Sequence, residues 1–140
     1  MMNSICKLRI HKFSKYYSKS HEWIQLTDKP KLYKVGISDY AQDQLGGVVY
    51  LSFPDTNTIY KRNEVLAEIE SPKAVSSIYA PVDIKITELN ERISDDYSVI
   101  NTDAENTWLF KGEVENENDL KVLMDSDTYK EFLKKQNQEQ

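Results

Sequence analysis

The chain has 140 residues, a formal net charge of −5 and an apolar fraction of 39%, which fits one folded domain rather than a disordered chain. No apolar run approaches the roughly 20 residues of a membrane-spanning helix, so we expect no membrane insertion. The single cysteine, Cys6, excludes an internal disulfide and a cysteine-based metal site. Two histidines without an HExxH spacing predict no zinc site.

Charge is distributed unevenly along the chain. Residues 1–20 hold five basic residues and no acidic one, which leaves 13 of the 18 basic and all 23 acidic residues for the rest. A basic segment without acidic residues is typical of an organellar transit peptide. We therefore expect residues 1–20 to be a disordered targeting segment for the mitochondrial matrix, with plastid import or a tail without function as alternatives. The acidic remainder argues against nucleic acid as a partner.

Short apolar and β-branched stretches between turn residues predict seven strands, at residues 21–26, 32–37, 47–53, 64–71, 74–80, 83–90 and 107–114. Ser38 can cap a short helix after the second strand, and Gly46 can end it in a left-handed conformation. The i, i+3, i+4 spacing near the end predicts two short helices. Many short strands and few helices predict a mainly β fold, a sandwich or flattened barrel of two sheets, over residues 21–135, with a polar tail at 136–140.

One lysine lies between the fourth and fifth predicted strands, in the stretch ESPKA. Ser71 suits the first position of a type I turn, and Pro72 suits the second because the φ of proline is already near −65°. Lys73 then falls at the tip of the turn with its side chain in water. A solvated hairpin charge has this geometry, and so does a lysine presented to a modifying enzyme. The turn alone does not separate the two.

Five stretches taken together resemble the H protein family of the glycine cleavage system. They are HEW at 21–23, VGISDYAQDQLGGVVYLSFP at 35–54, ESPKA at 70–74, IYAPV at 78–82 and LNERISDDYSVINTD at 89–103. They follow in register from about residue 21 to residue 133. The resemblance implies a lipoyl/biotinyl-type flattened β-barrel or sandwich with a short internal helix and C-terminal helices. It also implies that lipoic acid is bound covalently to Lys73.

The same resemblance implies a carrier without catalytic activity of its own. Its partners would be a pyridoxal-phosphate glycine decarboxylase, a tetrahydrofolate-dependent aminomethyltransferase, a dihydrolipoyl dehydrogenase and a lipoate-attaching enzyme. Glu70, Pro72 and Ala74 would form the recognition turn around Lys73. A role as a lipoyl donor for other complexes is an alternative that the sequence leaves open. Biotin carriers have methionine on both sides of their lysine, whereas Pro72 and Ala74 flank Lys73 here.

In this family the loaded arm can fold back into a surface cleft. By position, the resemblance implies that Ser20, Glu22, Gln44 and Ser77 line this cleft. A carboxylate is the group that an ammonium-bearing arm needs, and Glu22 would supply it. The alternative is that Glu22 is an ordinary exposed carboxylate on a strand.

The sequence departs from the family at several turns. Asn57 and Asn63 replace glycines, and asparagine is the non-glycine residue best able to adopt a positive φ. Ile84 also replaces a glycine, and isoleucine disfavours a positive φ, so we expect extended or strained backbone there. Pro72 replaces the usual valine and removes a backbone donor beside Lys73.

Overall fold

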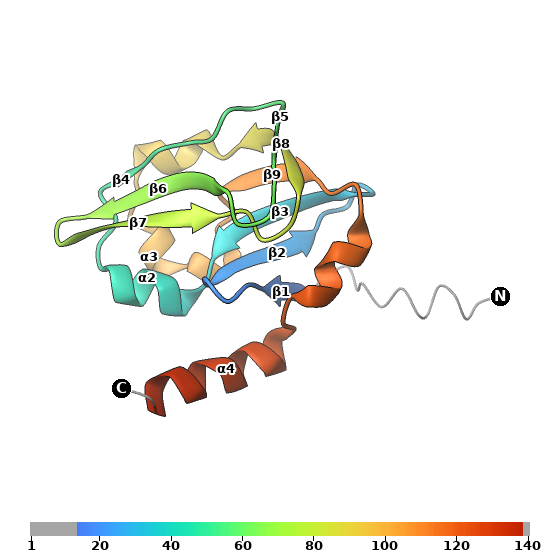
Figure 1. Cartoon of the computed structure of the whole chain (residues 1–140). Helices are drawn as coiled ribbons and strands as arrows, with labels where there is room; N and C mark the ends of the chain where they lie inside the picture. The colour runs from blue at the N-terminus through green and yellow to red at the C-terminus, as the bar shows by residue number, and fades with distance from the viewer. Residues whose placement is uncertain (1–13, 139–140) are drawn as a thin grey trace.

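The structure is a computed structural model that describes residues 14–138, and it consists of two antiparallel sheets (Figure 1). The six-stranded sheet contains, in spatial order, β1 (Lys15–Tyr17), β2 (Glu22–Leu26), β3 (Leu32–Ile37), β9 (Phe110–Glu113), β8 (Ile84–Leu89) and β5 (Thr58–Tyr60). The three-stranded sheet contains β4 (Tyr50–Leu51), β6 (Val65–Ser71) and β7 (Ala74–Tyr79). The mainly β, two-sheet prediction is confirmed. Because the larger sheet ends in edge strands β1 and β5, the fold is a sandwich and not a closed barrel.

The core lies between the two sheets and follows from the alternation of side chains along the strands. In β8, Ile84 and Ile86 are buried while Lys85 between them is exposed. In β6, Leu66, Ala67 and Ile69 are buried. These side chains meet Phe110 of β9, which is fully buried. The core therefore fixes the register of the strands, because a shift of one residue would expose its apolar side chains.

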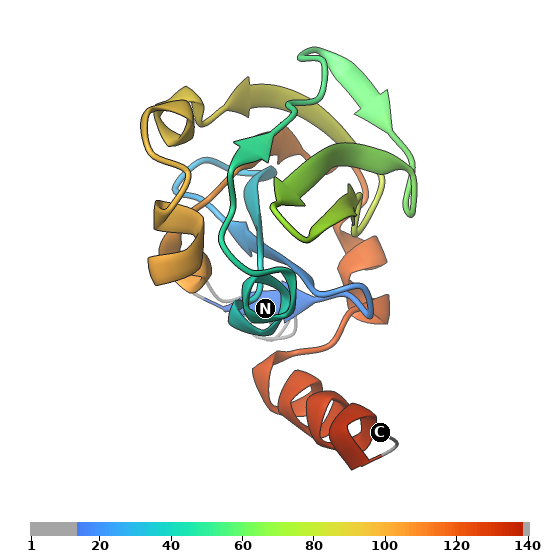
Figure 2. The same cartoon turned by 90° about the vertical axis from the view of Figure 1, so that its left-hand side faces the viewer.

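Helices cover the ends and one side of the sandwich. They are α2 (Asp39–Leu45), η1 (Glu91–Asp95), α3 (Val99–Thr102), η2 (Ala104–Asn106), η3 (Glu117–Val122) and α4 (Ser126–Gln138), where η marks a 3₁₀ helix. Ser38 caps α2 as predicted, since its Oγ accepts a hydrogen bond from the Ala41 N–H at 3.1 Å. Gly46 ends α2 with a φ of 92°. Figure 2 shows α2, in teal, below the β6–β7 hairpin and in front of the first strands of the larger sheet.

Three predictions about turns and backbone are confirmed. Asn57 has a φ of 57° and Asn63 a φ of 72°, so both replace glycine in left-handed conformations. Ile84 begins strand β8 and is extended. Asparagine tolerates the left-handed region of backbone conformation. Ile84 does not have to adopt a positive φ, because it lies in an extended strand.

Several predicted bounds differ from the structure. The predicted strand 47–53 is only two residues long, the predicted strand 107–114 begins at Phe110, and β5 was not predicted. The first of the two expected C-terminal helices is the 3₁₀ helix η3. The second, α4, continues to Gln138, so the expected polar tail at 136–140 lies partly within a helix. Short edge strands depend on their partner strand more than on their own sequence.

The sequence predicted that residues 1–20 form a disordered segment before the folded domain. Residues 1–13 lie outside the part of the chain that the structure describes, and within the described part the prediction is wrong, because the fold begins before residue 20. Lys15–Tyr17 forms β1, which pairs with β2, and Tyr17 is buried. The Lys15 Nζ lies 3.1 Å from the Glu105 carboxylate and 4.4 Å from the centre of the Trp23 ring. Counting charges along the sequence could not reveal that Glu105, 90 residues away, neutralises Lys15. Any separate targeting segment is therefore shorter than the one predicted.

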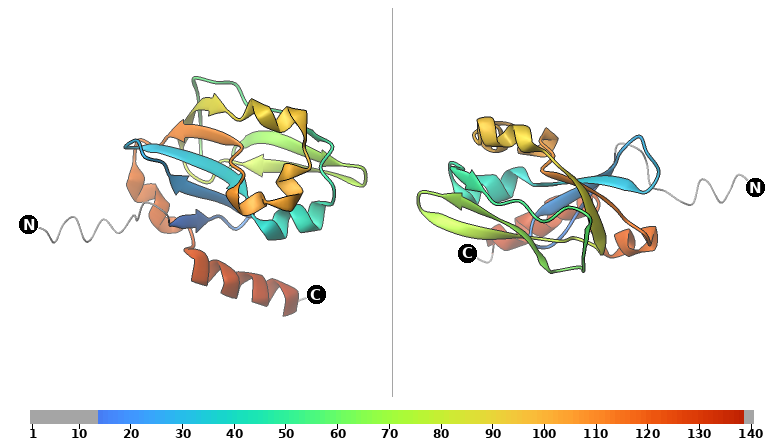
Figure 3. Two further views of the ribbon diagram at one scale, coloured as in Figure 1. Left: turned by 180° about the vertical axis from the view of Figure 1, so that it is seen from behind. Right: turned by 90° about the horizontal axis from the view of Figure 1, so that it is seen from above.

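An aromatic cluster joins α4 to the first hairpin and to α2. The Tyr129 ring stacks on Tyr17 with 4.2 Å between ring centroids, and its hydroxyl lies 2.7 Å from both His21 Nδ1 and Ser38 Oγ. Burial raises the pKa of Tyr129 to about 12, and burial also lowers the pKa of His21. His21 has a φ of 77°, which turns the chain from β1 into β2. Figure 3 shows α4 beside β1.

Within residues 14–138, no helix is long and apolar enough to cross a membrane.

Candidate functional site

Lys73 lies at the tip of the β6–β7 hairpin, as predicted. Ser71 pairs with Ala74, so Pro72 and Lys73 are the two residues of the turn. The Lys73 N–H donates to the Ser71 Oγ at 3.3 Å, and Ser71 itself is buried. Lys73 does not have the positive φ that a type II turn would need, so the backbone is compatible with the expected type I turn. The result is an exposed lysine on a short, hydrogen-bonded turn. Figures 1 and 3 show that the β6–β7 hairpin projects from one end of the molecule.

The end of α2 lies directly beside the Lys73 side chain. A Cβ atom placed on Gly46 would lie 3.1 Å from Lys73 Cε, 3.7 Å from Nζ and 3.9 Å from Cδ. Gly46 therefore has two functions, because its φ of 92° suits glycine and its missing side chain leaves room for the lysine stem. The neighbouring Gly47 has neither constraint, since a Cβ there would meet nothing within 4 Å.

Asn101 in α3 holds this end of α2 in place. Its Nδ2 donates to the Gly46 carbonyl and to Gln42 Oε1, each at 2.9 Å, and its Oδ1 accepts from the Val48 N–H at 2.8 Å. One amide side chain thus satisfies three groups on the segment that lies beside Lys73. Sequence reasoning did not identify Asn101, because its partners lie more than 50 residues earlier in the chain.

Glu22 is buried, with 1% of its surface exposed, so the alternative of an ordinary exposed carboxylate is wrong. Its Oε1 accepts hydrogen bonds from the Ser18 and Ser20 hydroxyls, each at 2.5 Å, and its Oε2 accepts from the Tyr79 N–H at 2.9 Å. Burial raises the pKa of the Glu22 carboxyl, and these donors partly oppose that increase. The carboxylate therefore connects β2 in the larger sheet to β7 in the smaller one.

The remaining predicted residues lie at the same end of the fold but do not form one contact set. Glu70 and Ala74 belong to the hairpin, and Ser77 pairs with Glu68 further along β7. Gln44 is exposed on α2, which packs against β7. Gln42, two residues before Gln44 on α2, accepts the hydrogen bond from Asn101. Across residues 14–138, no group of three or more His, Cys, Asp or Glu side chains is arranged to hold a metal ion.

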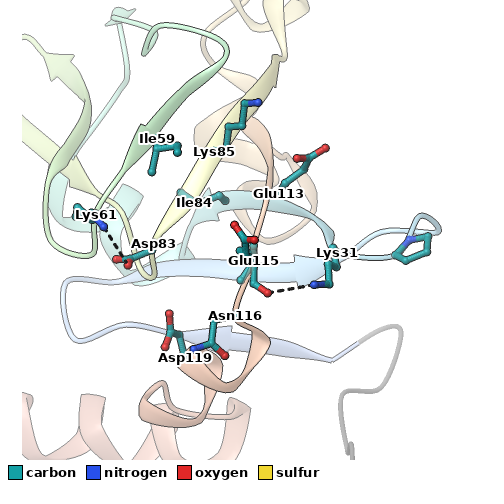
Figure 4. A pocket seen from close by; sticks show the side chains of 12 residues that line it. Lys31, Ile59, Lys61, Asp83, Ile84, Lys85, Glu113, Glu115, Asn116 and Asp119 are labelled. Atoms are coloured by element: carbon teal, nitrogen blue, oxygen red, sulfur yellow. Dashed lines mark hydrogen bonds and ion pairs between the residues drawn. The ribbon is translucent and has the colours of Figure 1, made fainter.

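A pocket of about 670 Å³ lies at the opposite end of the β6–β7 hairpin from Lys73 (Figure 4). Lys61 and Asp83 line it near the start of β6, and their charged atoms are 3.9 Å apart. The Lys31 Nζ donates to the Glu115 carbonyl at 3.2 Å in the same pocket. None of the predicted site residues lines this pocket, so it is separate from the lysine turn.

An exposed lysine on a hairpin tip of a two-sheet β sandwich is presented in the way that a carrier modified on one side chain requires. Comparison with known proteins agrees with this class. The family model described as "Glycine cleavage H-protein" matches residues 15–136. The chain therefore belongs to the glycine cleavage H-protein family, whose members are carrier proteins rather than enzymes.

Individual relatives support the assignment. The "Glycine cleavage system H protein" of Thermotoga maritima is 44% identical over 119 residues, which cover 84% of this chain and 94% of the relative. The "Probable glycine cleavage system H protein" of Pyrococcus abyssi is 46% identical over 120 residues, covering 85% and 89%. The crystal structure of a glycine cleavage system H protein from Mycobacterium marinum has a TM-score of 0.73 at 27% identity, covering 88% of this chain and 96% of that one.

The contact between Gly46 and Lys73 predicts that the two adjacent glycines respond differently to substitution. Gly46→Ala should lower the free energy of unfolding by about 1–2 kcal/mol, because alanine is strained at a positive φ. Gly47→Ala should change it little, since a Cβ there has open space. Urea unfolding of both variants measures this difference.

Gly46→Asn should not recover this loss, because a φ of 92° with a ψ of −168° lies outside the left-handed region that asparagine tolerates and is open essentially to glycine alone. Both Gly46 variants should also alter the rate at which a small amine-reactive reagent modifies Lys73, since a Cβ there would lie 3.1 Å from Lys73 Cε. Equal stability losses in Gly46→Ala and Gly47→Ala would contradict the assignment.

Proposed function

We propose that Lys73 carries lipoic acid in amide linkage and that the chain shuttles the aminomethyl group of glycine between the enzymes of the glycine cleavage system. The observation that supports this most directly is the exposed Lys73 on the hairpin tip, inside a family match that spans residues 15–136. The local geometry fits an attached arm. The amine is accessible, and the missing side chain of Gly46 leaves space along the lysine stem.

The proposed partners are the glycine decarboxylase, the aminomethyltransferase, the dihydrolipoyl dehydrogenase and a lipoate-attaching enzyme. When bound, the lipoyl group supplies a disulfide that can be reduced and reoxidised as it accepts and releases the carried group. The contribution of this chain is to keep the arm tethered and its root rigid. Tethering raises the effective concentration of the carried group at each partner, because the group cannot diffuse away between steps.

We also propose that Ser20, Glu22, Gln44 and Ser77 border the surface on which the loaded arm rests. Ser20 is exposed and its hydroxyl bonds to Glu22, which places a polar, negatively charged region close to the edge of β7. Because the Glu22 carboxylate is buried and already has three donors, an arm would sense its charge through Ser20 unless the Ser18–His21 turn opens.

The assignment of Lys73 predicts the outcome of a conservative substitution. Lys73→Arg keeps a positive charge on the exposed turn, so the free energy of unfolding should change by less than about 0.5 kcal/mol. The variant should gain no lipoyl mass when it is incubated with a lipoate-attaching enzyme, whereas the wild-type chain should gain one lipoyl group. Intact-mass spectrometry with peptide mapping measures both. A lipoyl group on another lysine would refute the assignment, and Lys85→Arg, an exposed lysine on β8, serves as the matched control.

A second prediction concerns the charge of Glu22. Glu22→Gln retains an acceptor for the Tyr79 N–H but removes the negative charge, so the fold and the lipoylation of Lys73 should be preserved. The aminomethyl-loaded carrier should lose its ammonium-bearing group sooner, because the negative charge of Glu22 no longer stabilises it. The half-life of the loaded carrier without the folate enzyme is the quantity to compare, with Glu88→Gln on β8 as control. Equal half-lives in all three proteins would limit Glu22 to a structural role.

Mitochondrial import remains a proposal that rests on the basic, acid-free composition of the first residues alone. The relatives named above are bacterial and archaeal, and they do not support a transit peptide. Since β1 begins at Lys15, a targeting segment would be confined to residues 1–14. Fusion of residues 1–14 to a fluorescent protein should direct it to mitochondria, and a diffuse cytosolic signal would refute the proposal.

A further inference from the structure

Helix α4 is attached to the rest of the fold through few buried groups. Tyr129 is the one buried side chain over residues 126–136, and Phe132 is partly buried. Just before the helix, the backbone of Met124 exchanges two hydrogen bonds with Tyr17 of β1, at 2.7 and 2.8 Å. Figures 1 and 2 show that α4 lies outside the two sheets. A helix held in this way can leave the surface without unfolding of the sandwich.

The Tyr129 hydroxyl lies in the middle of a chain of three hydrogen-bonding groups. It is 2.7 Å from His21 Nδ1 in the β1–β2 turn and 2.7 Å from Ser38 Oγ at the start of α2. Ser38 is fully buried, and its Oγ already accepts the Ala41 N–H at 3.1 Å. When His21 is neutral and its Nδ1 carries no hydrogen, both hydroxyls have an acceptor. The Ser38 O–H donates to the Tyr129 oxygen, and the Tyr129 O–H donates to Nδ1.

Protonation of His21 removes one acceptor from this chain. Nδ1 then carries a hydrogen and donates it to the Tyr129 oxygen. Either the Tyr129 or the Ser38 hydroxyl can still donate to the other, but among the contacts of residues 14–138 the remaining hydroxyl has no acceptor. A buried hydroxyl without a partner is unfavourable, whereas water satisfies it once the surface opens. Protonation therefore favours a state in which α4 has left His21 and Ser38.

No carboxylate within residues 14–138 is paired with His21 to offset its positive charge. The oxygens of the neighbouring Glu22 accept from donors in the β1–β2 turn and in β7, and those of Glu105 accept from β1 and from the start of α2. Burial accordingly lowers the pKa of His21 below its ordinary value of about 6.5. The ionisable groups of the surrounding elements are Tyr17 on β1, Lys19 in the turn, Glu22 on β2, Tyr40 on α2, Glu105 on η2 and Tyr129 on α4.

We propose that His21, Tyr129 and Ser38 form a proton-sensitive latch, which holds α4 on the sandwich at neutral pH and releases it when His21 is protonated. The latch also reaches the lysine end of the fold, because Ser38 caps α2 and Gly46 at the other end of α2 lies beside the Lys73 stem. Release of α4 should therefore loosen the first turn of α2. The latch is independent of any modification of Lys73, so the unmodified chain is sufficient to test it.

The direction of the pH dependence follows from linkage. Docking of α4 lowers the affinity of His21 for a proton, so protonation weakens docking by the same factor. Docking should be complete above about pH 6.5, the ordinary pKa of histidine, and should weaken as the pH falls through the lower pKa of the docked state.

Hydrogen exchange of the full-length chain, followed by mass spectrometry, measures opening of α4. Peptides from α4, α2 and β6 are compared at about pH 7.5 and about pH 5, with each rate divided by the intrinsic rate of an unfolded peptide at that pH. We expect opening of α4 to be at least about tenfold more favourable at the lower pH, with a smaller increase in α2. Exchange in β6 should change by less than about twofold. Equal opening of α4 at both pH values, or an equal response of all three elements, would refute the latch.

Replacement of each histidine assigns the response. His21 has a φ of 77°, and asparagine is the non-glycine residue that best tolerates a positive φ, so His21→Asn removes the titrating ring at small cost to the backbone. Opening of α4 in this variant should be the same at both pH values within about twofold. His11→Asn, which replaces the other histidine of the chain, should keep the wild-type response. A response that persists in His21→Asn would belong to carboxylates and would overturn the proposal.

The reciprocal effect is tested at Tyr129. Tyr129→Ser removes the buried ring and the shared hydroxyl, and Lys130→Ser, an exposed neighbour on α4, is the matched control. Tyr129→Ser should open α4 at both pH values and return the pKa of His21 to about 6.5, measured by NMR titration of the ring. Lys130→Ser should match wild type in both measurements. The latch is refuted if α4 stays protected in Tyr129→Ser, or if the pKa of His21 stays lowered after α4 has opened. Exchange in β6 confirms in each variant that the sandwich is intact.

Discussion

The buried carboxylate of Glu22 is the contact that ties the hairpin carrying Lys73 to the larger sheet. It accepts hydrogen bonds from the turn between β1 and β2 and from the Tyr79 N–H of β7, so one side chain connects the two sheets. A buried charge is costly unless it is fully hydrogen-bonded. The three donors must therefore keep their positions, and the hairpin that carries Lys73 is held against the larger sheet. Burial raises the pKa of the carboxyl, so ionisation of Glu22 opposes folding as the pH rises through that pKa.

The same principle applies to the segment on the other side of the lysine. Asn101 satisfies three groups at the end of α2, and Gly46 provides the backbone conformation and the open space beside the lysine stem. The segment beside the Lys73 stem is thus held in place, while the lysine itself is exposed. A carrier benefits from this combination, because a rigid root gives every partner the same geometry and a flexible stem lets the arm reach different active sites.

Much of this fold and the position of the site follow from local sequence. The bounds of β3, the cap at Ser38, the end of α2 at Gly46 and the turn at Lys73 were all predicted, because each depends on residues within about four positions of one another. The left-handed turns at Asn57 and Asn63 follow from the same local chemistry. The family resemblance added the identity of the carrier, since five motifs at the correct spacing specify more than any one turn.

Tertiary structure decided the environment of those residues. The sequence could not show that Glu22 is buried, that Asn101 holds the end of α2, or that Lys15 is paired with Glu105, because each depends on partners 50 or more residues apart. It also could not bring His21, Ser38 and Tyr129 into one hydrogen-bonded chain, since the packing of α4 brings them together. The amino-acid sequence by itself determined which residue is presented and the turn that presents it. Only the packing of the sheets and helices determined what surrounds that residue, because burial and hydrogen-bond partners are properties of the folded chain.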